Sequence, residues 1–157
     1  MKIRIILLLM TLLCGVNLAS GQQKVLAKFY VTHAINNGND ITEWAVKSKV
    51  FTVFYTDNKQ FYMANYAEKD NTQSWGKIWG LYNQTKPETS SNYKTDIFYF
   101  NWDYKNSYDS KTGTCKAQLL KIYKPQGVVS VLKLITETLD VTEYTGYMEG
   151  TIDFSNL

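Results

Sequence analysis

The feature that most constrains this chain is a regular alternation of apolar and polar side chains in runs of about ten residues. One side of the run 142–154 carries Tyr144, Gly146, Met148, Gly150, Ile152 and Phe154, and the other carries Glu143, Thr145, Tyr147, Glu149, Thr151 and Asp153. A period of two residues is typical of a β-strand with one face in the core and the other in water. The alternation therefore predicts an all-β protein.

Eight runs have this character, since Val, Ile, Thr, Tyr, Phe and Trp dominate them and polar turns separate them. We expect strands at residues 24–35, 48–56, 60–68, 74–83, 95–105, 114–124, 128–137 and 142–154. Most connections have hairpin length, so consecutive strands should pair antiparallel. Residues 41–47 are ambiguous, because Asp40 and Glu43 have the spacing of a helical capping box. Residues 84–94 are expected to form a long polar loop.

Eight long strands in a meander must hide their edges, either by closing into an up-and-down barrel or by forming a two-sheet sandwich. Strands of about ten residues span roughly 30 Å at about 3.3 Å per residue, which is long enough to wrap a cavity. We therefore favour a single antiparallel barrel over residues 22–157, with the sandwich as the alternative.

Such a barrel resembles the calycins, the group that includes lipocalins and avidins, in architecture alone. The first-strand Gly-x-Trp motif of lipocalins is absent, because Trp44 follows Ile41-Thr42-Glu43. The arginine that packs on that tryptophan in lipocalins also has no counterpart. The resemblance implies a lipocalin-like barrel and transfers no function.

Residues 1–21 have the features of a secretory signal peptide: Lys2 and Arg4, an apolar run at residues 5–13, and small residues near the end. The apolar run is shorter than the roughly 20 residues that a membrane-spanning helix needs, and no other stretch comes close. We therefore expect a secreted or periplasmic protein with no transmembrane segment. The alternative is a lipid anchor on Cys14.

Removal of residues 1–21 leaves 15 basic and 14 acidic residues, a net charge of +1, and no arginine. Arginine supplies the planar fork that binds phosphate through two hydrogen bonds. Its absence and the low net charge argue against nucleic-acid binding.

One cysteine, Cys115, remains after cleavage, so it is either buried or joined to another molecule in a disulfide-linked dimer. One Cys and one His cannot build a metal cluster, and we expect no cofactor. His33 is the single candidate for a neutral-pH base, and no nucleophile-elbow motif accompanies it. The sequence therefore favours a protein that is not an enzyme.

The aromatic residues are the main candidates for a binding site, and all 23 lie outside the signal peptide. Phe98, Phe100 and Trp102 share one face of their strand, and are either core or the lining of an apolar cavity. On the strand 74–83, alternation places Trp75, Lys77, Trp79 and Leu81 on one face and Gly76, Ile78, Gly80 and Tyr82 on the other. Trp75, Trp79, Tyr82 and Tyr99 are the candidates for an exposed aromatic surface.

Two functions fit these residues. In the first, the barrel carries a small apolar or amphipathic ligand in its interior, next to Phe98, Phe100 and Trp102. In the second, surface aromatic rings such as Trp75, Trp79 and Tyr99 bind a glycan or another protein outside the cell. A structural role in the cell envelope is the third hypothesis, and a hydrolase is the least supported.

Overall fold

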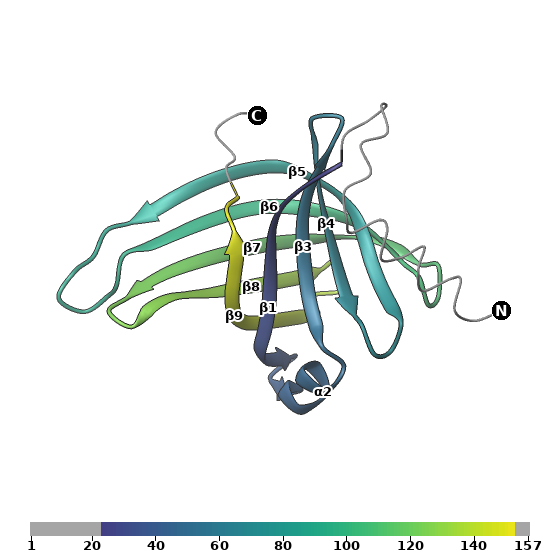
Figure 1. The fold of residues 1–157 in the computed structure, drawn as a ribbon, viewed down its shortest axis with the longest axis horizontal. Coiled ribbons are helices and arrows are strands. Elements are labelled where there is room, and N and C mark those ends of the chain that lie inside the picture. The colour runs from purple at the N-terminus through teal and green to yellow at the C-terminus, as the bar shows by residue number, and fades with distance from the viewer. Residues whose placement is uncertain (1–22, 153–157) are drawn as a thin grey trace.

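The computed structural model describes residues 23–152, which form a closed antiparallel up-and-down barrel of eight strands (Figure 1). The strands are β1 (Lys24–Asn36), β3 (Val50–Asp57), β4 (Gln60–Ala67), β5 (Thr72–Lys86), β6 (Thr95–Asn106), β7 (Thr112–Lys124), β8 (Gly127–Thr136) and β9 (Val141–Gly150). Each strand pairs with the next, and β9 pairs with β1 to close the barrel. The expected barrel, rather than the sandwich, is therefore confirmed.

The predicted signal peptide and Cys14 lie outside the described residues. None of the helices within residues 23–152 has the length and apolar character needed to cross a membrane.

A short helix, α2 (Thr42–Lys47), follows the two-residue strand β2 (Asn39–Asp40), which extends the sheet beside β1. The expected capping box does not form, because Asp40 belongs to β2 and Ile41 takes the N-cap position. The Asp40 Oδ1 atom instead accepts a hydrogen bond from the Thr42 backbone N–H at 2.8 Å. The helix buries Ala45 and leaves Trp44 exposed.

The barrel interior contains side chains from every strand, as the alternation predicts. The largest buried contributors include Phe29, Phe54, Met63, Ile78, Phe100, Trp102, Leu119, Leu132 and Tyr144. Phe54 meets Phe100 edge to face, with ring centroids 6.3 Å apart, a favoured geometry for aromatic pairs. The Trp102 indole donates a hydrogen bond to the Met63 carbonyl oxygen at 3.1 Å. The rings are thus held by packing and by a buried hydrogen bond.

Polar side chains also lie among these residues, and they satisfy one another. Thr52, which is fully buried, donates from its hydroxyl to the Asn65 side-chain oxygen at 3.2 Å. The Asn65 amide in turn donates to the Tyr144 hydroxyl at 3.5 Å. Within residues 23–152, no buried side-chain nitrogen or oxygen lacks a hydrogen-bond partner. Such satisfaction is what a well-packed interior requires.

Three glycines, Gly76, Gly146 and Gly150, lie where the backbone of a neighbouring strand leaves no room for a Cβ atom. A Cβ atom on Gly76 of β5 would collide with the Asp103 carbonyl oxygen of β6, and one on Gly146 of β9 would collide with the Tyr30 carbonyl oxygen of β1. The first contact lies between the neighbouring strands β5 and β6, and the second lies in the pairing of β9 with β1 that closes the barrel (Figure 1). Glycine in a strand typically marks such a close approach.

Gly80 has a positive φ of 62° and lies at a register shift between Trp79 and Tyr82. This β-bulge adds a residue to β5 and reverses the alternation that follows it. Leu81 therefore packs against the core, and Tyr82 is exposed. The prediction that Leu81 shares a face with Trp75 and Trp79, and that Tyr82 lies on the opposite face, is wrong because of this bulge. β5 also continues to Lys86, so the expected loop 84–94 shortens to residues 87–94.

Replacement of Gly146 by alanine should destabilise the barrel by about 2–3 kcal/mol, because the new methyl group forces β1 and β9 apart. Urea unfolding followed by circular dichroism measures the change. Gly38→Ala is the comparison: a Cβ atom there meets nothing within 4 Å, so its loss of stability comes only from its positive φ of 80°, which Gly146 does not share. Equal losses of stability for the two variants would contradict the role of Gly146 in closure.

Candidate functional site

The candidate site is a hollow of about 480 Å³ on the outer face of the barrel, where β4, β5, β6 and β7 run side by side. It is lined by Tyr62, Trp75, Gly76, Asp103, Tyr104, Lys105, Thr112, Gly113 and Thr114. We call it the outer groove. Its walls thus combine aromatic rings with charged and hydroxyl groups.

The strand register explains why these side chains meet. Trp75 pairs with Ala64 of β4 and with Lys105 of β6, and Lys105 pairs with Thr112 of β7. Residues that face one another across strands point to the same side of a sheet. One row of outward side chains therefore crosses four strands, and Ala64 is the smallest of them. Trp75 in this row is half-buried.

The polar side of the outer groove is partly preorganised. The Thr114 hydroxyl donates a hydrogen bond to Asp103 Oδ1 at 2.8 Å, which holds the exposed carboxylate in place. Within the described residues, Asp103 Oδ2 has no hydrogen-bond partner, and Lys105 has no ion pair. A ligand in the outer groove would therefore find a free acceptor and a free cationic donor next to an aromatic ring.

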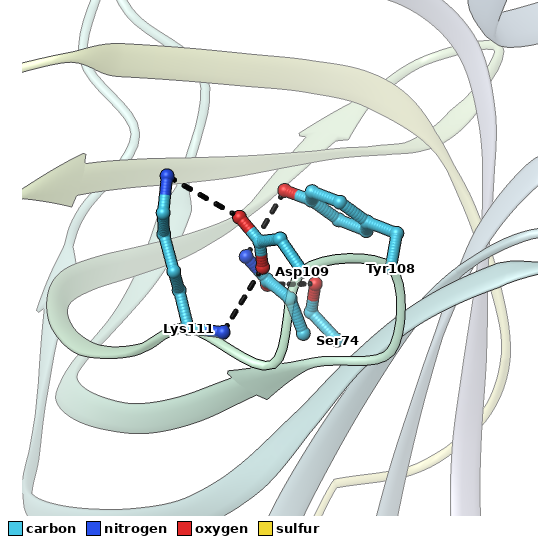
Figure 2. A network of polar contacts seen from close by, with 5 residues as sticks. Ser74, Tyr108, Asp109 and Lys111 are labelled. Atoms are coloured by element: carbon cyan, nitrogen blue, oxygen red, sulfur yellow. Dashed lines mark hydrogen bonds and ion pairs between the residues drawn. The ribbon is translucent and has the colours of Figure 1, made fainter.

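A polar network fixes the turn between β6 and β7, whose strand ends form one side of the outer groove (Figure 2). The Ser74 hydroxyl donates to Asn106 Oδ1 at 2.7 Å, and the Asn106 amide donates to the Tyr108 hydroxyl at 3.0 Å. Asp109 accepts a hydrogen bond from the Lys111 backbone N–H at 3.0 Å, and its carboxylate lies 3.5 Å from the Lys111 ammonium nitrogen. These contacts tie the turn to β5.

Several tyrosine rings on the outer surface stack on another aromatic ring, whereas, within residues 23–152, the rings of Trp75 and Trp79 do not. Tyr82 stacks on Tyr99 with centroids 4.6 Å apart, and Tyr55 stacks on Tyr62 at 5.4 Å. Each stacked pair covers one face of each of its two rings. No such ring contact joins Trp75 to another aromatic residue in the described part of the chain, and the same holds for Trp79. Neither tryptophan is therefore part of a stacked aromatic pair in the described residues.

A second hollow, of about 290 Å³, lies where β4 and β5 separate, and we call it the fork. It is lined by Gln60, Phe61, Lys77, Ile78, Trp79, Gly80 and Leu81. Ladder pairing between the strands ends at Tyr62 and Lys77, and beyond it the Gln60 side-chain amide donates to the Ile78 carbonyl oxygen at 3.2 Å. Trp79 is 46% exposed beside this hollow.

The sequence-predicted candidates divide into two groups that do not meet. Phe100 and Trp102 are each 3% exposed and belong to the core, and the partly buried Phe98 packs against it. The four other candidates, Trp75, Trp79, Tyr82 and Tyr99, lie on the outer side of β5 and β6. The outer groove contains one of them, Trp75, and the fork contains another, Trp79.

Cys115 is buried in the core on the inner side of β7, as one of the two sequence hypotheses expects. Burial raises the pKa of its thiol to about 11, and the Glu137 carboxylate adds to the effect. No disulfide is present among the described residues. The position of Cys115 gives no support to a dimer joined through this thiol.

His33 is exposed, and its Nδ1 atom lies 2.7 Å from the Thr42 hydroxyl at the start of α2. The same hydroxyl accepts a hydrogen bond from the Ala34 backbone N–H at 3.0 Å, so these contacts join β1 to α2. Among residues 23–152, no group of three or more His, Cys, Asp or Glu side chains is placed to hold a metal ion.

Comparison of this chain with protein-family models, with curated proteins and with solved structures finds no match.

Sequence reasoning missed most of the polar lining of the outer groove, namely Lys105, Thr112 and Thr114, and also Tyr62. The alternation does place Tyr99, Asn101 and Asp103 on one face, and the same rule extends to Lys105. The missing information was the register in which β4 pairs with β5, β5 with β6 and β6 with β7, because it decides which side chains lie next to one another across the strands.

Cys115 should react with a thiol reagent such as DTNB roughly a hundredfold more slowly in the folded protein than in guanidinium, because burial shields it and suppresses the thiolate. The rate of colour development at pH 8 measures this. Fast labelling of the folded protein would contradict the buried position, as would a dimer that reducing agents dissociate.

Proposed function

We propose that this protein is an extracellular binding module that recognises a carbohydrate through the outer groove. The observation that carries the proposal is the combination, in one hollow, of the Trp75 ring with the Asp103 carboxylate and the Lys105 amine. The extracellular location rests on the signal peptide that the sequence predicts.

The chemistry of sugars matches this lining. A pyranose ring has an apolar face of C–H groups, which packs on an aromatic ring, and a rim of hydroxyls, which need both acceptors and donors. Trp75 offers the ring, Asp103 offers an acceptor, and Lys105 and Thr112 offer donors. A hollow of about 480 Å³ is of the size typical for small-molecule sites.

The interior-carrier hypothesis has less support from the geometry. Phe100 and Trp102, which would line its cavity, are in close contact with other buried side chains. The polar groups of the interior are already paired with one another in the described residues. Of the two hollows described above, the outer groove lies on the outer face of the sheet.

Replacement of Trp75 by alanine should weaken binding to the recognised sugar about tenfold or more, which corresponds to ~1.4 kcal/mol, because the stacking face is lost. A glycan array identifies the sugar, and isothermal titration calorimetry measures the affinity. Trp75→Phe keeps a ring and should retain part of the affinity, and Asp103→Asn removes the charge while leaving the groove shape intact.

Trp44→Ala is the matched control, because Trp44 is exposed on α2 outside the outer groove. It should leave the affinity unchanged. Circular dichroism verifies that each variant is folded. Unchanged binding by a folded Trp75→Ala protein would exclude the outer groove as the site, as would equal losses for the Trp44 and Trp75 variants.

A further inference from the structure

The end of β5 is a free sheet edge. Pairing with β4 stops at Lys77, whereas pairing with β6 continues as far as Lys86. Within the described residues, no strand pairs with residues 80–86 on the side away from β6. Figure 1 shows this part of β5 running on beside β6, away from β4. Backbone N–H and C=O groups along about seven residues therefore face solvent on that side.

This edge has little of the protection that natural proteins give to exposed strands. Charges, prolines and bulges normally block an edge. Here the Gly80 bulge lies at one end and Lys86 with Pro87 at the other, while residues 81–85 contain no charge and no proline. Tyr82 is 60% exposed, and the residues after it are exposed as well. An edge of this kind accepts another extended polypeptide strand.

We propose that the strand it accepts is the same edge of a second copy of this chain, paired antiparallel about a two-fold axis at Asn83. In this register Asn83 faces the partner's Asn83, Tyr82 faces the partner's Gln84, and Leu81 faces the partner's Thr85. Lys86 faces the partner's Gly80, so no like charges are opposed. The partner's Glu88 approaches Lys77, which is a pairing of opposite charges.

A second copy fits this edge better than an unrelated strand because the pairing is self-complementary. A two-fold interface covers both free edges at once and closes the assembly, so that no filament can grow from it. The outer groove remains open, because it lies on the sheet face beside β4, β6 and β7 and not at the free edge. The dimer is therefore independent of the carbohydrate proposal.

The area of the interface sets the expected strength of the dimer. A pairing of about seven residues per strand buries less than the roughly 1,600 Å² of a standard stable interface. We therefore expect a reversible dimer whose population rises with protein concentration. Sedimentation velocity of the mature chain over a hundredfold concentration range should show a shift from the monomer mass to twice that mass.

Charge substitutions at the two-fold axis test the register directly. Asn83→Lys places two positive charges opposite each other, and Asn83→Glu places two negative charges there, so each variant alone should remain monomeric. An equimolar mixture of the two should recover the dimer mass, since opposite charges then meet. Asn92→Lys adds the same charge in the exposed loop 87–94 and should dimerise like the unmodified chain.

Asn83 is exposed, so neither substitution should disturb the core, and circular dichroism confirms folding. A chain that stays monomeric at every concentration would overturn the proposal. It would also be overturned if both Asn83 variants dimerised like the unmodified protein, or if their mixture failed to recover the dimer.

Discussion

The barrel depends on places where strand backbones approach too closely for a side chain, at Gly76 against Asp103, at Gly146 against Tyr30 and at Gly150 against Leu26. The first lies between the paired strands β5 and β6, and the other two lie in the pairing of β9 with β1 that closes the barrel. Closure at these points brings the inward faces of all eight strands together, so that large side chains pack against one another in the interior. Close packing of this kind is the reason that we propose a binding site on the outer surface.

The outer surface differs from that of a simple solvated barrel because aromatic rings are arranged on it in rows. Many of them stack in cross-strand pairs such as Tyr30 with Tyr147, at 5.2 Å, and Phe51 with Tyr66, at 4.9 Å. Such pairs stabilise a sheet and cover their own ring faces. Trp75 is different, because it borders a hollow that also contains an acid and an amine. The distinction between stacked and unstacked rings is therefore what separates structural aromatic residues from candidates for binding.

The fold could be predicted from the sequence to a large extent, because alternation and turn composition are local properties. The strand count and the antiparallel order follow from them. The barrel and the burial of Cys115 were each one of two alternatives, and the pairing of β9 with β1 and the inward position of Cys115 decide between them. The faces of Leu81 and Tyr82 could not be predicted, since a bulge at Gly80 reverses the alternation without any change in strand composition. Prediction of the outer groove requires the register of four strands, and register is set by contacts between residues far apart in the sequence.

The central claim is that ligands bind to the outer surface of this barrel and not in its interior. The four tryptophans of the protein can report on binding at either place. The indole N–H of Trp102 is bonded inside the barrel, whereas Trp75 lines the outer groove. We would record the four indole signals by nitrogen-15 NMR, assigned through Trp→Phe variants, while adding soluble oligosaccharides and, separately, a fatty acid. The account predicts that an oligosaccharide shifts the Trp75 signal and that neither addition shifts that of Trp102. A saturable shift of the Trp102 signal on addition of the fatty acid, with Trp75 unchanged throughout, would contradict it and favour the interior carrier.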